Sequence, residues 1–317
     1  MTEALSRQRQ DDSAVAALAR ARAAVNRVIL DKAEVVDLAF SALLAGGHLL
    51  IEDLPGVGKT TLANALSLAI GGQLQRIQFT NDMLPADIVG ISVFRRENEV
   101  FEFRPGPIFA NVVLADEINR ATPRTQSALL EAMAEGQITV DGQTHALPQP
   151  FFVIATQNPL DLVGTYPLPD SQLDRFLLRT RIGYPSPDEE RRLLVEPDRR
   201  DLLADMRPEL DAEQVQTLIG AAAELHVSDP VLDYIQALVK ATRMHAGLRA
   251  GLSPRAGLAL VQSARAYAFV NQQSFCSPDS VKAVFTALAI HRLQPIPETG
   301  LASEDVVAEI LETTAVP

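Results

Sequence analysis

The chain has 317 residues, of which 47% are hydrophobic, and it carries a formal net charge of −12. This length allows about two domains with a sizeable core, and the acidic balance argues against a nucleic-acid binder, which needs clustered Lys and Arg to neutralise phosphates. The single cysteine, Cys276, excludes an intramolecular disulfide framework and is typical of a reducing compartment.

The N-terminal residues predict a tail ahead of the folded part. Residues 1–13 are polar and lack the apolar stretch of a signal peptide. The more apolar segment that follows is interrupted by Arg20, Arg22 and Arg27, and no segment has the uninterrupted apolar length of a membrane span. We therefore expect a disordered tail over residues 1–13 and a folded domain from residue 14.

A glycine-rich loop after the first strand is the most specific local pattern. An apolar strand begins at Leu49, a turn rich in Pro and Gly follows it, and a helical pattern covers residues 61–70. This order is the context of a phosphate-binding loop, because glycines let backbone N–H groups close around phosphates at a helix N-terminus. The predicted loop consists of Pro55, Gly56, Val57, Gly58, Lys59, Thr60 and Thr61.

Two side chains of this loop have predicted roles. Lys59 reaches the β- and γ-phosphates of a nucleoside triphosphate, and the hydroxyl of Thr60 is a ligand of Mg²⁺. Asp53 departs from the general pattern, since it stands where the first glycine is expected. The surrounding strand and helix still predict a protein that binds a nucleoside triphosphate.

Further apolar segments predict a parallel sheet. They alternate with helical patterns as far as Pro185 and cover residues 74–79, 111–116, 151–156 and 176–182. Strands as evenly apolar as these are typical of a parallel sheet that is buried on both faces under helices. We therefore expect an α/β nucleotide-binding domain over residues 14–185.

Two β-hairpins are expected to interrupt this domain. Residues 138–140 and 143–146 flank Asp141-Gly142, which is a strong two-residue turn signal. Residues 92–94 and 100–103 flank a second turn. Both pairs also fit simple extensions of the sheet.

An apolar strand that ends in two carboxylates predicts the catalytic acids. Asp116 and Glu117 lie at the carboxyl edge of the predicted sheet, where ligands bind in open α/β folds. We expect Asp116 to hold Mg²⁺ through water and Glu117 to polarise the attacking water as general base. Asn158, after the next strand, is expected to hydrogen-bond both the attacking water and the γ-phosphate.

After Pro185 the pattern becomes entirely helical, which predicts a smaller all-α domain over residues 186–317. Ser277 and Ser253, each followed by proline, mark expected helix starts. The second start puts Arg255 in a first helical turn, where a cation opposes the helix dipole by roughly 0.3–1 kcal/mol. A phosphate in front of that helix would reverse the effect, whereas the alternative interpretation is a solvated surface arginine.

Taken together, these motifs resemble the AAA+ ATPases and, within them, the MoxR family of the helix-2-insert group. The likeness extends from about residue 23 to residue 311, and it departs at Leu30-Asp31, where the family has Gly-Gln near the adenine. The matching segments are residues 46–50, 55–60, 76–80, 84–90, 115–120, 155–159, 166–169 and 172–176.

The resemblance implies roles for single residues. Asn158 matches sensor 1, Arg175 matches the arginine finger, and Arg255 matches the sensor 2 arginine, which is expected to act on nucleotide bound by its own subunit. The two predicted hairpins match the helix-2 insert and the pre-sensor-1 hairpin. The resemblance thus implies an AAA+ domain with a C-terminal lid.

The same resemblance implies a cytoplasmic homo-oligomeric ring, a hexamer, that couples Mg²⁺-dependent ATP hydrolysis to remodelling or maturation of other proteins. Members of this family often work beside partners that carry von Willebrand factor A domains, and some of them take part in the insertion of metal ions or cofactors. Three alternatives stay open: a nucleic-acid motor, a chelatase-type motor subunit, and a nucleotide-dependent assembly scaffold that hydrolyses slowly. The acidic balance argues against the first.

Overall fold

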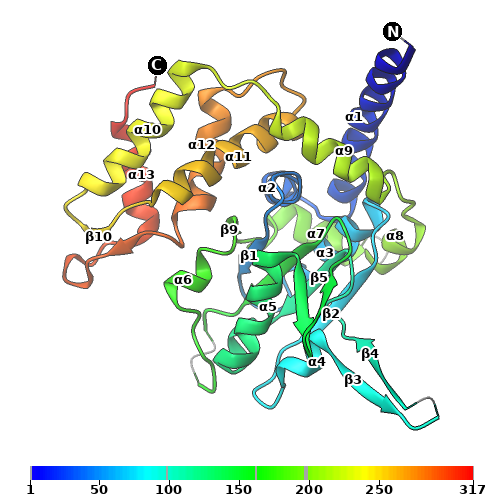
Figure 1. Cartoon of the computed structure of the whole chain (residues 1–317). Coiled ribbons are helices and arrows are strands. Elements are labelled where there is room, and N and C mark those ends of the chain that lie inside the picture. The colour runs from blue at the N-terminus through cyan, green and yellow to red at the C-terminus, as the bar shows by residue number, and fades with distance from the viewer. Residues whose placement is uncertain (1, 98, 161–162, 196–198, 317) are drawn as a thin grey trace.

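Figure 1 shows the computed structural model of the chain, which describes residues 2–97, 99–160, 163–195 and 199–316. A parallel sheet with helices on its two faces forms the larger part, and helices from the C-terminal third lie beside it. The predicted combination of an α/β unit and a helical unit is confirmed. Within the described residues, no helix has the length and apolarity needed to cross a membrane.

The central sheet has five strands in the order β2-β5-β8-β1-β9, and every neighbouring pair is parallel. β5 and β8 are buried almost throughout, as expected for parallel strands covered on both faces. The carboxyl ends of β1, β5 and β8 therefore meet at one edge of the sheet. The strand bounds are β1 Leu49–Glu52, β2 Leu74–Gln78, β5 Val112–Asp116, β8 Phe152–Gln157 and β9 Leu178–Thr180.

The prediction that the four strands after the phosphate loop are buried on both faces is wrong for β2. This strand lies at the edge of the sheet, and Arg76 and Gln78 on it are exposed. Its register places Gln78 beside Asp116 of β5. The edge position thus brings two polar side chains to the same end of the sheet as the predicted catalytic acids.

Two separate sets of buried side chains cover the two faces of the sheet. On one face, Leu49 and Ile51 pack in a core shared with the helices α1 to α3. On the other face, Leu50 and Val113 pack with Leu129 of α5. The helices of this part are α1 Thr2–Val28, α2 Ala33–Leu44, α3 Lys59–Ala69, α4 Pro85–Val89, η1 Ile118–Arg120, α5 Pro123–Glu135 and α6 Asp170–Leu173.

The N-terminal residues form part of a helix rather than the expected disordered tail. Helix α1 begins at Thr2, and its first turns project beyond the body of the protein (Figure 1). Residues 2–10 include Glu, Ala, Leu, Arg and Gln, which are strong helix formers and favour a helix in this segment. Buried packing of the helix is seen from Ala14 onward.

Both predicted hairpins are present as separate two-stranded sheets. In the turn of the second hairpin, Asp141 and Gly142 have φ of 48° and 79°, as a two-residue turn of this type requires. The first hairpin carries the ring contact between Phe94 and Phe101, whose centroids lie 5.2 Å apart. The strands are β3 Gly90–Arg95, β4 Val100–Pro105, β6 Gln137–Val140 and β7 Gln143–Ala146.

The C-terminal part is helical with a small addition. Ser253 and Ser277 accept hydrogen bonds from Ala256 N and Ser280 N, so both cap helices at the predicted starts. The expected all-α class of this part is confirmed, and it also contains two short antiparallel strands, β10 Leu248–Ala250 and β11 Gln294–Pro295, which pair with each other. The helices are α7 Pro187–Val195, α8 Arg199–Asp205, α9 Ala212–Ala223, α10 Asp229–Met244, α11 Pro254–Val270, α12 Pro278–Ala289, η2 Pro297–Thr299 and α13 Ser303–Thr313.

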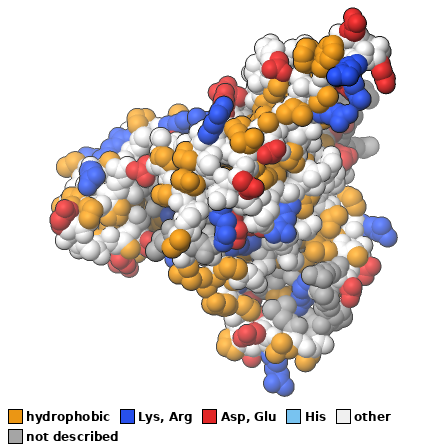
Figure 2. All heavy atoms as spheres, turned by 90° about the horizontal axis from the view of Figure 1, so that it is seen from below, with side chains coloured by type: hydrophobic (Ala, Val, Ile, Leu, Met, Phe, Trp, Pro, Cys, Tyr) orange, Lys and Arg blue, Asp and Glu red, His pale blue; other side chains and the backbone are white. Residues whose placement is uncertain are grey.

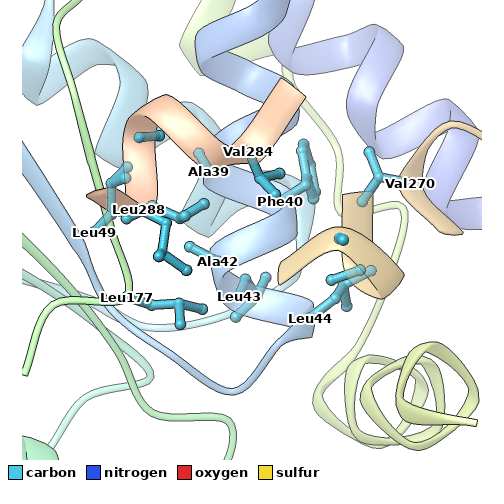
Figure 3. Close-up of a cluster of buried hydrophobic side chains, with 14 of the residues drawn as sticks. Ala39, Phe40, Ala42, Leu43, Leu44, Leu49, Leu177, Val270, Val284 and Leu288 are labelled. Carbon is cyan, nitrogen blue, oxygen red and sulfur yellow. The ribbon is translucent and has the colours of Figure 1, made fainter. Parts of the chain in front are cut away.

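A continuous apolar core joins the C-terminal helices to the α/β part. Figure 3 shows Phe40 and Leu43 of α2 in one cluster with Leu177, which precedes β9, and with Val284 and Leu288 of α12. The helical part therefore packs on the α/β part through α2. The boundary between residues 185 and 186 stays a prediction.

His48, just before β1, is held neutral inside this packing. Its Nδ1 accepts a hydrogen bond from Val153 N at 3.0 Å, so its Nε2, 3.1 Å from the oxygen of Met133, is the donor. Burial lowers the pKa of His48 to about 4. Between this value and its ordinary pKa of about 6.5, only the unfolded chain binds a proton at residue 48.

We therefore expect acid to destabilise the protein in that window. Between pH 7.5 and pH 5, His48 lowers the free energy of unfolding by about 2 kcal/mol, since stability falls wherever the unfolded state binds more protons. In urea titrations at the two pH values, His48→Asn is expected to lose about 2 kcal/mol less than the wild type. An equal loss in both proteins would contradict this assignment.

Candidate functional site

The phosphate loop takes its shape from two glycines. Gly56 and Gly58 have φ of 85° and 97°, and Gly58 caps the N-terminus of α3. A Cβ at either position would meet no atom within 4 Å, so glycine is needed for its backbone conformation rather than for space. Helix α3 then begins at Lys59, and the first N–H groups of the helix point toward the loop.

Asp53 explains the departure from the general motif. Its carboxylate accepts hydrogen bonds from the N–H groups of Leu54, Ile182 and Gly183, at 2.8, 2.7 and 2.6 Å. Its backbone does not adopt the positive φ that would favour glycine. The aspartate therefore ties the phosphate loop to the segment that follows β9.

The structure brings most of the predicted site residues together around a cavity of about 340 Å³. The loop forms one wall, and the other comes from the ends of β2, β5 and β8. The lining residues are Pro55, Gly56, Gly58, Lys59, Thr60, Thr61, Arg76, Gln78, Asp116, Glu117 and Asn158. We refer to this space as the phosphate cavity.

Val57, the remaining predicted loop residue, lies beside a second cavity of about 230 Å³. This cavity shares Gly56, Gly58 and Thr61 with the phosphate cavity, and the rest of its lining is mostly apolar, with Lys32 and Arg199 as the charged residues. An apolar space that adjoins a phosphate site is suited to the base of a nucleotide. Leu30 also lines it, which places that departure from the family pattern next to the expected base.

Asp116 and Thr60 offer the oxygen ligands that Mg²⁺ prefers. Asp116 is buried, one of its oxygens accepts a 2.6 Å hydrogen bond from Thr156 Oγ1, and the other lies 2.7 Å from a guanidinium nitrogen of Arg76. The described residues contain no cluster of three or more His, Cys, Asp or Glu that could enclose a metal ion. One carboxylate and one hydroxyl fit Mg²⁺ well, because this ion keeps several waters and takes further ligands from phosphates.

Glu117 has an unusual backbone and a fixed carboxylate. Its φ is 58°, a left-handed conformation that is uncommon outside glycine and is concentrated at functional sites. Its N–H donates to Thr156 Oγ1 at 2.9 Å, and its Oε2 lies 2.9 Å from Gln78 Nε2 and 2.8 Å from Arg120 Nε. The carboxylate thus lies beside the phosphate cavity, held by contacts from β2 and η1.

Sequence reasoning missed Arg76, Gln78 and Arg120 as partners of the two acids. The first two come from the strand that pairs with β5, and this pairing follows from the strand order of the sheet rather than from any local motif. The polar residues at alternate positions of β2 were the available signal, since a buried central strand would not carry them.

Asn158 is buried at the end of β8, and its Oδ1 accepts a hydrogen bond from Leu160 N at 3.1 Å. Because the oxygen is engaged, the amide nitrogen is the group that can donate to a phosphate oxygen. This assignment agrees with the expected contact to the γ-phosphate.

Lys59 is held in place by the loop itself. Its Nζ donates to the carbonyl oxygens of Asp53 and Leu54, at 2.6 and 3.0 Å. Burial lowers the pKa of Lys59, while the carboxylates of Asp116, Asp53 and Glu117 act in the opposite direction. The ammonium is thus positioned at the phosphate cavity.

We expect Lys59→Ala to weaken binding of ATP with Mg²⁺ by at least roughly 10- to 100-fold, because hydrogen bonds to charged groups contribute about 1.5–3 kcal/mol each. Titration calorimetry measures this affinity directly. The matched control is Lys240→Ala on the exposed side of α10, which should bind ATP as the wild type does. Unchanged affinity of Lys59→Ala would contradict the phosphate-loop assignment.

Arg175 and Arg255 lie at a different cavity from the rest of the predicted site. This cavity of about 360 Å³ lies between the start of β1, α5, α6 and α11, and its lining includes Arg175, Arg255 and Arg292. We call it the arginine cavity. Arg175 is exposed, and one of its guanidinium nitrogens donates to the oxygen of Leu130 at 3.0 Å.

The position of Arg255 differs from the expectation. The resemblance placed it at the nucleotide of its own subunit, but it is not among the residues around the phosphate cavity of the same chain. Helix α11, whose first turn carries Arg255, packs on α2 and α12 instead. The predicted site residues therefore fall into two groups on one chain.

Comparisons with known proteins identify two matched regions of the chain. Residues 48–178 match the ATPase family associated with various cellular activities (AAA), and residues 240–310 match the AAA lid domain. The first range contains Arg175 and every residue that lines the phosphate cavity, and the second contains Arg255 and Arg292.

Similar proteins cover nearly the whole chain. It is 44% identical over 296 residues to the uncharacterized protein YeaC of Bacillus subtilis, with 92% of each chain covered. It is 37% identical over 317 residues to the chaperone MoxR1 of Mycobacterium tuberculosis, with 95% of this chain and 82% of the relative covered. The solved structure of a "putative ATPase" from Cytophaga hutchinsonii matches with a TM-score of 0.89 at 29% identity over 100% of both chains. The chain is thus an ATPase that belongs to the MoxR family of AAA ATPases.

Proposed function

We propose that this protein hydrolyses ATP with Mg²⁺ in a ring, in which Arg175 of each subunit completes the phosphate cavity of its neighbour. The observation that carries the proposal is the division of the site. Lys59, Asp116, Glu117 and Asn158 lie around one cavity, and Arg175 is exposed at another. Each chain accordingly offers a nucleotide pocket to one neighbour and an arginine finger to the other.

The charge around the phosphate cavity supports this division. Among the described residues that line it, the cations are Lys59 and Arg76, and Arg76 is paired with Asp116. Charge that develops on the γ-phosphate in the transition state calls for a further cation, which an arginine from a second chain supplies in many ATPases and GTPases. The exposed guanidinium of Arg175 is suited to that role.

We further propose that the ring is a cytoplasmic hexamer that uses ATP hydrolysis to remodel or mature client proteins. The basis is membership of a family in which a relative bears the name chaperone. A partner with a von Willebrand factor A domain, and assistance with metal or cofactor insertion, belong to the same proposal and come from the family resemblance.

A nucleic-acid motor is less well supported. Figure 2 views the molecule from below relative to Figure 1. Over the described part of this face, Lys and Arg side chains are distributed among acidic, apolar and neutral ones. The net charge of −12 agrees with this distribution. A protein that tracks nucleic acid needs a groove of clustered cations.

The test is a mixture of two inactive proteins. Arg175→Ala keeps the pocket and loses the finger, whereas Lys59→Ala loses the pocket and keeps the finger. Mixed in equal amounts under conditions of subunit exchange, they should recover up to about a quarter of the wild-type rate. In a randomly assembled head-to-tail ring, half of the pockets are intact, and about half of these face a neighbour that still carries the finger. No recovery, despite co-assembly verified by native mass spectrometry, would contradict the proposal.

The same mixture tells which pocket Arg255 serves. We propose that it acts with Arg175 on the neighbour's nucleotide, since both line the arginine cavity. Arg255→Ala should then reduce the recovered rate only when the substitution is placed in the chain that donates the finger. If the rate falls only when the substitution is placed in the chain that donates the pocket, Arg255 acts on the nucleotide of its own subunit.

A further inference from the structure

The turn that carries Arg175 is held by a buried arginine from the C-terminal helices. Arg292 follows α12, and only 6% of its side chain is exposed. Its Nε donates to Asp174 Oδ1 at 2.7 Å. Its other two guanidinium nitrogens donate to the carbonyl oxygens of Phe176 and Leu177, at 2.8 and 3.0 Å.

These contacts lie on both sides of the finger in the sequence. Asp174 precedes Arg175, and Phe176, whose side chain is fully buried, follows it. The neighbouring residue His291 adds a second contact to the same place, since its Nε2 lies 2.9 Å from the oxygen of Phe176. The finger side chain itself stays exposed between two fixed neighbours.

The chemistry of this contact favours a positioning role over plain packing. A buried guanidinium is costly unless a carboxylate and further acceptors satisfy it, and apolar residues of similar volume often stabilise a core as well or better. Its planar set of donors can bind a carboxylate and several carbonyl oxygens in one fixed geometry, which a lysine cannot reproduce. The contact therefore fixes the path of the backbone at residues 174–177.

We propose that Arg292 is a positioning residue for Arg175, so that the lid of each subunit sets the finger which that subunit presents to its neighbour. The inference rests on the proposed function. It predicts that loss of Arg292 acts across the subunit interface, on hydrolysis by the next subunit.

The experiment places Arg292→Lys in either half of the complementing mixture. In the finger-donating chain, which also carries Lys59→Ala, it should lower the recovered rate by roughly 10- to 100-fold, because small misplacements of a catalytic group have effects of this size. In the pocket-donating chain, which carries Arg175→Ala, it should have little effect, since that chain has no finger to position.

Controls separate positioning from folding. Glu304→Gln removes another contact between the two parts of the chain, the ion pair of Glu304 with Arg181, and should leave the recovered rate unchanged in either chain. Melting temperature and ATP affinity are measured for every variant. If Arg292→Lys does not assemble, Asp174→Asn, which weakens the same contact from the finger side, is expected to give the same one-sided loss.

The outcomes are distinct. An equal loss in both halves would make Arg292 a folding residue and overturn the inference, and no loss in either half would overturn it as well. A parent mixture that recovers no activity would overturn the proposed function itself, before any change at residue 292 is made.

Discussion

Arg175→Ala is expected to bind ATP as the wild type does and to hydrolyse it about 10³- to 10⁵-fold more slowly. Arginine fingers supplied by a second chain have effects of this size, equivalent to roughly 4–7 kcal/mol of transition-state stabilisation. Binding is preserved because an arginine finger acts on charge that develops in the transition state, whereas Lys59 and the phosphate loop of the other chain hold the nucleotide in the ground state. Steady-state hydrolysis and calorimetry measure the two quantities separately.

The matched control is Arg207→Ala, which removes another exposed arginine that lines neither cavity. It should hydrolyse ATP at the wild-type rate. If Arg175→Ala retained more than about a tenth of the wild-type kcat in fully assembled protein, a role as arginine finger would be excluded.

Glu117→Gln is expected to bind ATP with Mg²⁺ and to lose about 10²- to 10⁴-fold in kcat, the usual contribution of a general base. The amide cannot take a proton from the attacking water, although it has nearly the same shape. It can still accept a hydrogen bond from Gln78 Nε2. The fixed position at the end of β5 is therefore kept while the proton acceptor is lost.

Glu135→Gln, on the exposed end of α5, provides the control for a lost surface carboxylate. It should leave both affinity and kcat unchanged. Normal turnover by Glu117→Gln would show that another group accepts the proton.

Local patterns predicted those features that depend on a few adjacent residues. The turn at Asp141-Gly142 needs positive φ at both positions, and the serine caps at Ser253 and Ser277 satisfy the first N–H groups of their own helices. The phosphate loop is local in the same sense, because Gly56 and Gly58 set its backbone.

Features that depend on distant pairing were not available from the sequence. Gln78 lies beside Asp116 because β2 is the edge strand next to β5, and strand order is a property of the whole sheet. Arg255 reaches the arginine cavity because α11 packs on α2, and this contact joins two helices that are far apart in the sequence. Arg292 showed no motif at all, and its contacts join residues more than 110 positions apart.

The most direct test of a site shared between two chains is the rate of ATP hydrolysis per chain across a dilution series. Analytical ultracentrifugation of the same samples gives the fraction of assembled protein. If Arg175 acts on the neighbour's nucleotide, the rate per chain should rise and fall with the assembled fraction, and monomers should retain about 10⁻³ of the full rate or less. Monomers that hydrolyse ATP at the full rate per chain would contradict the account.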